Sequence, residues 1–104
     1  MTPIAFDVLL CLLGGEAHGY AIMQAVRERS PGRAMHAGTL YRALARMVDA
    51  DWIREVDDVE ATSGDERRRY YAITTSGRDA ARAEARRLAE KVGAARDLGL
   101  LEPA

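Results

Sequence analysis

The chain has 104 residues, a length that fits one domain with a modest hydrophobic core. Its composition, 48% hydrophobic and 30% charged, is that of a folded protein and excludes a disordered one. The formal net charge of −1 excludes nucleic-acid binding by overall positive charge, so any such binding requires a local basic patch.

The first predicted helix covers residues 4–13 and is apolar on nearly every side. Thr2-Pro3 is typical of an N-cap followed by proline at the first helical position, and Gly14-Gly15 ends the helix. The run is too short to span a bilayer and no signal peptide precedes it, so we expect a cytoplasmic protein with no membrane partner.

A helix that is apolar all round must be covered on more than one side, and a domain of this size has little material to cover it. We therefore expect a second copy of the chain to pack against this helix. The residues assigned to this side of the dimer interface are Ile4, Phe6, Val8, Leu9 and Leu12.

Two further helices are predicted over residues 20–29 and 36–48, with Ser30-Pro31-Gly32 ending the first of them. The second has an apolar face that consists of Leu40, Leu44, Met47 and Val48. Thr39, Arg42 and Arg46 lie on the opposite face, and Tyr41 lies at the border. Arginine can read guanine edges or clamp phosphate, and threonine can donate to phosphate. Two short helices with such a face predict a helix-turn-helix.

A β-hairpin is predicted next, with strands at residues 52–56 and 69–74 and a turn between them. The last helix opens at Thr75-Ser76-Gly77 with a hydroxyl cap. Its apolar positions alternate in steps of four and three, which is typical of a coiled-coil seam. We assign to the dimer interface the seam residues Ala81, Ala85, Leu88 and Val92. Residues 98–104 are expected to form a frayed tail.

The order of elements predicts a mainly α fold with a small β-hairpin. We expect a winged helix-turn-helix with three N-terminal helices, a two-stranded wing and a long C-terminal helix. On this prediction residues 1–74 are the DNA-binding domain, and residues 75–104 are the C-terminal dimerisation helix and its tail.

Three motifs resemble the PadR family of bacterial transcriptional regulators, in its short form with one C-terminal helix. His18-Gly19-Tyr20 resembles the opening of the family's second helix, and residues 38–44 (GTLYRAL) resemble its recognition helix. Residues 67–74 (RRRYYAIT), followed by Gly77, resemble its second wing strand and the entry to the last helix.

The resemblance implies a homodimeric repressor that binds a palindromic operator in double-stranded DNA. It implies control of the protein's own or adjacent genes and release by a small-molecule or stress signal. We expect no cofactor. The DNA contacts that it implies come from Tyr20, His36, Thr39, Tyr41, Arg42, Arg46, Arg67, Arg68 and Arg69.

The chain departs from the family pattern in places. His36 stands where serine is frequent, so a hydroxyl cap is lost. Asp51 stands where glycine is usual, and aspartate tolerates the left-handed backbone that glycine would adopt. Acidic residues flank the wing and would be repelled by phosphate, so we expect Arg67 and Arg68 to touch DNA while the acidic tip stays away. These acids are Asp57, Asp58, Glu60, Asp65 and Glu66.

The sequence leaves two other classes of protein to compare with this prediction. An enzyme would need a nucleophile with a base, or paired carboxylates in a cleft, and the acids of this chain gather instead in the predicted hairpin. A winged helix that has lost DNA binding and binds proteins is favoured by the near-neutral charge and the acidic wing. The face with Thr39, Arg42 and Arg46 argues against this second class.

Several single residues have two interpretations. Trp52 could line an effector pocket between two chains or pack under the third helix. Tyr70 and Tyr71 could stack on bases, or one could be in the core with the other beside the last helix. Cys11 could be a redox sensor, but its apolar segment disfavours a thiolate and favours inert packing. His18 and His36 have no companions at ligand spacing, so we expect no metal site.

Overall fold

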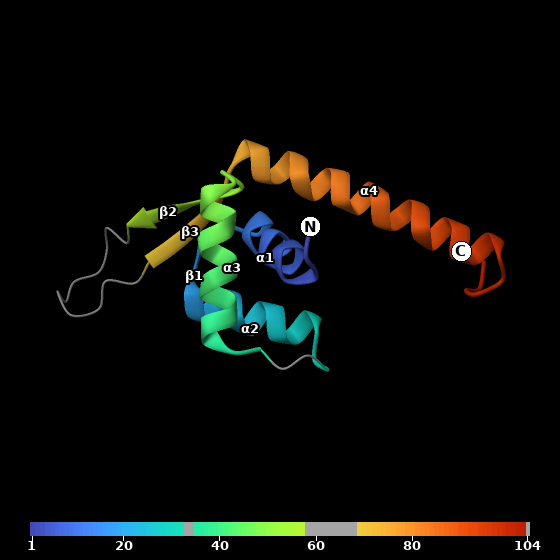
Figure 1. Ribbon diagram of the computed structural model, residues 1–104, viewed down its shortest axis with the longest axis horizontal. Coiled ribbons are helices and arrows are strands. Elements are labelled where there is room, and N and C mark those ends of the chain that lie inside the picture. The colour runs from blue at the N-terminus through green and yellow to red at the C-terminus, as the bar shows by residue number, and fades with distance from the viewer. Residues whose placement is uncertain (33–34, 58–68, 104) are drawn as a thin grey trace.

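The computed structural model describes residues 1–32, 35–57 and 69–103, and in them it has four helices and a small antiparallel sheet. The helices are α1 Pro3–Leu13, α2 Gly19–Arg29, α3 Ala37–Asp49 and α4 Thr75–Asp97, and the strands are β1 Ala17–His18, β2 Ile53–Asp57 and β3 Arg69–Ile73. This order confirms the predicted winged helix-turn-helix with a long C-terminal helix (Figure 1). Within the described part of the chain, no helix is both long and apolar enough to cross a membrane.

Local caps start the helices close to where the sequence predicts. Thr2 caps α1 because its Oγ1 accepts a hydrogen bond of 3.1 Å from the backbone N–H of Ala5, and a proline takes the first turn. At α4 the cap is Thr74, whose Oγ1 accepts from the N–H of Gly77 at 2.9 Å. The N-cap of α3 is His36, which makes no side-chain cap hydrogen bond, as the missing hydroxyl leads one to expect.

The sheet has three strands where a two-stranded wing was predicted. β1 pairs antiparallel with β3 through Ala17 with Tyr71 and His18 with Tyr70, so the strand order is β1-β3-β2. The sequence predicted only a turn before α2, and the structure has the strand β1 there. A strand of two residues is too short to show the alternation by which strands are detected.

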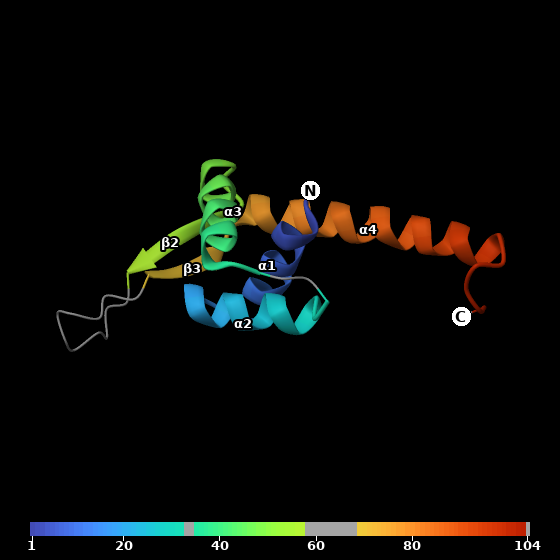
Figure 2. The same cartoon turned by 60° about the horizontal axis from the view of Figure 1, so that its bottom comes forward.

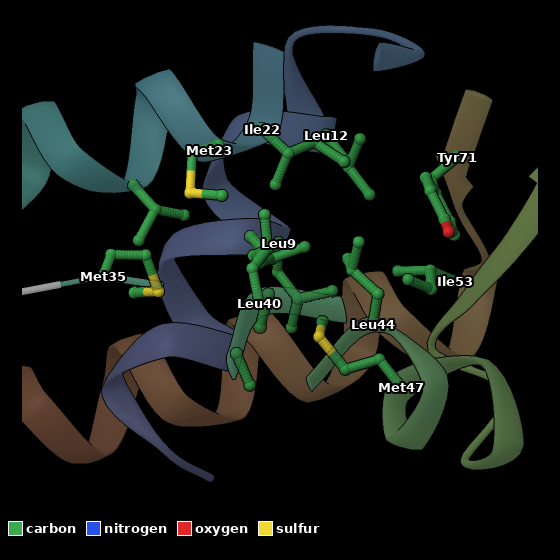
Figure 3. Close-up of a cluster of buried hydrophobic side chains, with 14 residues drawn as sticks. Leu9, Leu12, Ile22, Met23, Met35, Leu40, Leu44, Met47, Ile53 and Tyr71 are labelled. Atoms are coloured by element: carbon green, nitrogen blue, oxygen red, sulfur yellow. The ribbon is translucent and has the colours of Figure 1, made fainter. Parts of the chain in front are cut away.

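The hydrophobic core surrounds α1, which contacts α2, α3, β3 and α4 of the same chain (Figure 3). Val8 and Leu9 are 0% exposed and Leu12 is 2% exposed. The expectation that a second chain covers these three residues is therefore wrong, because four elements of their own chain already bury them. Ile4 and Phe6 are half-buried at the margin of this core.

The helix α4 is packed in its first half and projects away from the domain in its second half (Figures 1 and 2). Ala81, which was assigned to the dimer interface, is buried in the core of its own chain. Ala85, Leu88 and Val92 lie further along and are exposed. The division after residue 74 stays a prediction, since the first half of α4 shares one core with α1.

The chain beyond α4 does not begin as the frayed tail that was expected. Gly99 has a φ of +84°, and the N–H groups of Leu98 and Leu100 donate to the carbonyls of Ala94 and Ala95 at 3.0 and 2.8 Å. This is a hydrogen-bonded helix stop of the kind that a left-handed glycine allows. It holds Leu98 and Leu100 in solvent, where they are 79% and 77% exposed.

A tight corner joins the end of α3 to the start of α4. Asp51 has a φ of 62°, which confirms the predicted left-handed backbone. The carbonyl of Trp52 accepts from the N–H of Thr74 at 3.0 Å, and the Thr74 hydroxyl donates to the Asp51 carbonyl. A Cβ at Gly77 would lie 2.0 Å from the Trp52 oxygen, so glycine is required there. The corner fixes α3 and α4 to each other.

Candidate nucleic-acid interface

The helix α3 is held by one face and presents the other to solvent. Its core-facing side chains Leu40, Leu44 and Met47 are buried, which confirms the predicted apolar face. Arg42 and Arg46 are exposed on the opposite side. Because the apolar face is anchored in the core, the arginines stand on a rigid support rather than on a loop.

Thr39 and Arg42 form a small polar group in the first turns of α3. The Arg42 guanidinium lies 3.5 Å from Thr39 Oγ1, at the limit of hydrogen-bond distance. Thr39 is half-buried, whereas Arg42 and the preceding His36 are exposed. The arrangement leaves the guanidinium able to turn toward a phosphate or a base edge.

Sequence reasoning missed three further residues of this exposed face. Gly38, Ala45 and Asp49 are exposed on α3. At about 100° per residue, Ala45 lies between Tyr41 and Arg46. Its small side chain would let a partner surface approach the helix closely. The helical periodicity predicts that Ala45 lies on this face, but an uncharged residue gives no sign of nucleic-acid binding.

Tyr41 links α3 to the start of α2. A Cβ at Gly19 would lie 2.7 Å from the Tyr41 hydroxyl, so the absence of a side chain at Gly19 makes room for the tyrosine. Tyr20 follows directly, is 66% exposed, and accepts a hydrogen bond of 2.8 Å from Gln24 Nε2. The two tyrosines that the resemblance assigns to DNA therefore belong to neighbouring parts of one surface.

His18 has a structural role that the sequence did not indicate. Its Nδ1 accepts from the backbone N–H of Ala21 at 3.2 Å, so the imidazole is the N-cap of α2. Its ring also packs edge-on against Tyr70 with centroids 5.6 Å apart. Among the described residues, no three potential metal ligands are grouped closely enough to hold an ion.

The two adjacent tyrosines of β3 take different roles. Tyr71 is buried in the core, which confirms the interpretation that one ring is a core residue. Burial raises the pKa of Tyr71, and the nearby Glu55 carboxylate raises it further. The second ring was expected beside the last helix, but Tyr70 instead packs on His18 because β1 lies next to β3.

Of the three wing arginines in the predicted site, the structure describes Arg69. Its Nη1 lies 3.6 Å from Glu55 Oε1, and the two side chains are 74% and 49% exposed. An ion pair this exposed is worth about 0–1 kcal/mol, so a phosphate could replace the carboxylate at little cost. The other wing residues of the prediction, Arg67 and Arg68, lie outside the described residues, as does the acidic tip (Asp58, Glu60, Asp65 and Glu66).

Trp52 and Cys11 both lie at the margin of the core. Trp52 is half-buried and packs against the core cluster, which fits the interpretation of a structural aromatic. Cys11 is half-buried, and burial raises the pKa of its thiol while Arg29 opposes this more weakly. The sulfur is therefore a neutral thiol near pH 7, as inert packing requires.

Solved structures share this fold. A PadR family transcription regulator from Clostridium difficile R20291 matches with a TM-score of 0.81 and 28% identity, over 93% of this chain and 98% of that one. A PadR-like regulator from Bacillus cereus matches with a TM-score of 0.79 and 18% identity, over 95% and 93%. Bacillus subtilis PadR in complex with operator DNA matches with a TM-score of 0.69 and 20% identity, over 81% and 47%.

Sequence comparison gives the family. An uncharacterized 37.1 kDa protein in transposon TN4556 of Streptomyces fradiae is 34% identical over 86 residues. The match covers 83% of this chain but only 23% of that protein, so the chain spans a small part of its relative. The model of the PadR-like family of transcriptional regulators matches residues 8–83, and such a family is not one of enzymes. The chain therefore belongs to the PadR-like family of transcriptional regulators.

Proposed function

We propose that this regulator binds DNA in a sequence-specific manner by placing α3 in the major groove. The observation that carries the proposal is the exposure of Tyr41, Arg42 and Arg46 on a helix whose other face is buried in the core. A helix with its bulk removed at Gly38 and Ala45 can approach base edges closely. The Bacillus subtilis protein of the same fold, solved in complex with operator DNA, supports this use of the fold.

Arg42 and Arg46 are expected to have different roles. They stand four residues apart, which is about 6 Å along a helix, so they meet different parts of the groove. We expect one to read a base and the other to hold phosphate. Thr39, His36, Tyr20 and the wing residues Arg67, Arg68 and Arg69 complete the proposed contact surface.

The test is a fluorescence anisotropy titration of labelled promoter DNA from around the protein's own gene. Replacing the base-reading arginine with alanine should cost about 1–3 kcal/mol and relax the preference at one position. Replacing the phosphate-holding arginine should weaken all sequences alike and reduce the salt dependence by about one unit of slope. Arg86→Ala, an exposed arginine on the side of α4 away from Leu88, is the matched control. If neither Arg42→Ala nor Arg46→Ala changes the affinity, α3 is not the reading helix.

We further infer that the working unit is a homodimer whose second copy covers the projecting half of α4. Leu88 and Val92 are exposed there, and Leu98 and Leu100 are held in solvent by the helix stop. Beside Ala81 lies a groove of ≈ 260 Å³ between α1 and α4, lined in part by Phe6, Leu10, Leu13 and Ala85. If two α4 helices cross antiparallel between Leu88 and Val92, the leucines at the end of each helix meet this groove on the other copy. A two-fold dimer of this kind suits a palindromic operator.

Sedimentation velocity at micromolar concentration tests the dimer. We expect the wild type to sediment as a dimer and Leu88→Asp to sediment as a folded monomer, because a carboxylate cannot be buried in an apolar seam without a partner. Arg86→Asp places the same charge on the opposite side of α4 and should leave the dimer intact. A folded wild-type monomer would contradict the proposal.

The same regulator is proposed to act in the cytoplasm as a repressor of its own or adjacent genes, released by a small-molecule or stress signal. The resemblance of its motifs supports this part. A reporter gene behind the protein's own promoter should be expressed more strongly when the regulator gene is deleted. The alternative, a winged helix that binds proteins only, is favoured by the net charge of −1. It would be the better account if the anisotropy titration showed no binding to any promoter fragment.

A further inference from the structure

A pocket opens beside the proposed reading helix. It has a volume of ≈ 430 Å³ and lies between the start of α1, the second half of α3 and the corner before β2. Pockets that hold small ligands measure about 300–1,000 Å³, so this one is large enough. The lining residues that matter here are Ala5, Ala43, Arg46, Met47, Ala50 and Trp52.

The chemistry of the lining defines the ligand. The small side chains of three alanines leave the pocket unfilled, and Met47 and Trp52 form polarizable apolar walls. Arg46 adds a guanidinium, whose planar fork pairs well with a carboxylate or sulfonate. We infer that this pocket binds a small, mostly apolar molecule with one anionic group, the apolar body against Trp52 and the anion on Arg46.

Arg46 connects this pocket to DNA binding. It lines the pocket and is also exposed on the face of α3 that we propose to read DNA, so this step rests on the proposed function. When the Arg46 guanidinium pairs with the anion of a ligand, it cannot also bind a phosphate or a base of DNA. Ligand and DNA therefore compete, and the ligand lowers the affinity for DNA.

The corner gives the ligand a second point of contact with the fold. Trp52 lines the pocket, and its carbonyl accepts from Thr74 and packs against Gly77 at the start of α4. A molecule seated on Trp52 therefore touches the junction through which α3 and α4 are fixed to each other. The pocket lies within one chain, whereas an effector pocket between two chains was the interpretation considered from the sequence.

The experiment uses two probes that differ in one group. The anionic probe is 1-anilinonaphthalene-8-sulfonate, and its uncharged counterpart is N-phenyl-1-naphthylamine. Trp52 is the only tryptophan of the chain, so energy transfer from it to either probe reports binding to the folded domain, and the variants locate the site. We expect both probes to bind wild-type protein, the anionic one more tightly.

Variants then separate the pocket from the charge. Arg46→Met should weaken the anionic probe about two- to fivefold, the worth of a partly exposed ion pair, and leave the uncharged probe unchanged. Ala43→Leu fills the pocket and should weaken both probes about tenfold. Ala83→Leu makes the same change at an exposed position of α4 outside the pocket lining and should change neither. Circular dichroism verifies that each variant is folded, and Ala50→Leu replaces Ala43→Leu if that variant is not.

Four results would contradict the inference or one of its steps. If the anionic probe binds Arg46→Met as tightly as wild type, Arg46 does not pair with the anion. If both probes bind Ala43→Leu and Ala50→Leu as tightly as wild type, they do not occupy this pocket. Binding only to the dissociated Leu88→Asp protein would show that a second copy occupies the pocket. Release of promoter DNA by the anionic probe supports the competition, and simultaneous binding of both contradicts it. If no promoter DNA binds at all, the proposed function fails while the probe titrations still decide on the pocket.

Discussion

The glycine at the start of α4 offers the sharpest test of how the fold is held. Glycine in a helix is normally a weak point, and its replacement by alanine usually gains about 0.5–1 kcal/mol. We expect Gly77→Ala to do the opposite. The new Cβ would lie 2.0 Å from the carbonyl oxygen of Trp52, and a backbone atom cannot move aside as a flexible side chain can.

The expected loss in the free energy of unfolding can be estimated from the contacts of the corner that the new Cβ would strain. Separating α4 from Trp52 strains two hydrogen bonds, from the Thr74 N–H to Trp52 and from the Thr74 hydroxyl to Asp51. Each is worth about 1 kcal/mol, and forcing a methyl group into a packed site costs about 1–3 kcal/mol more. After the gain in helix propensity, we expect a net loss of about 2–4 kcal/mol.

Urea denaturation of wild type and variants at one protein concentration measures this loss. Gly93→Ala is the matched control, because it lies in the same helix and a Cβ there would meet no atom of another part of the chain within 4 Å. That variant should be as stable as wild type or more stable by up to about 1 kcal/mol. If Gly77→Ala is also as stable as wild type, the close contact between α4 and Trp52 does not hold the corner together.

Three further outcomes are expected. Thr2→Ala should lower the free energy of unfolding by about 1 kcal/mol, because the N–H of Ala5 loses its cap. The Arg87 guanidinium donates to both Glu84 oxygens and holds the pKa of Glu84 below its usual range. Their pairing therefore stabilises the fold above the ordinary carboxyl pKa and is lost as the pH falls, so urea titrations in acidic buffers should find Glu84→Gln less pH-dependent than wild type. Because burial raises the pKa of Cys11, iodoacetamide should modify the folded protein more slowly than the protein in urea.

Local signals made much of this fold predictable. Thr2 accepts from an N–H group three residues away, so a hydroxyl before a helical run is enough to place the start of α1. At α4 the predicted hydroxyl cap lies one residue earlier than expected, on Thr74 and not on Thr75 or Ser76. Asp51 was predictable for the same reason, since its backbone is set by the turn that it occupies. The buried face of α3 followed from a period of 3.6 residues, and the exposed arginines followed from it in turn.

Contacts between distant residues were not predictable in this way. The pairing of β1 with β3 joins segments more than fifty residues apart and leaves no pattern in two residues. The role of His18 as a cap follows from that placement and not from its residue type. The proposed site was predicted from charge, which indicated its arginines but neither Ala45 nor the pocket beside Arg46.

The burial of α1 by its own chain changes what a dimer means for this protein. If a partner had to cover Leu9, folding and pairing would be one event, and any change in the interface would unfold the chain. Leu9 is instead 0% exposed in a single copy, while Leu88 is 36% exposed on the projecting half of α4. Leu9→Ala should therefore cost about 2–5 kcal/mol of folding free energy, whereas Leu88→Asp should cost dimer affinity and leave the domain folded. Under the proposed function, Leu88→Asp would therefore weaken binding to a palindromic operator, which needs two copies, while α3 stays folded on its core.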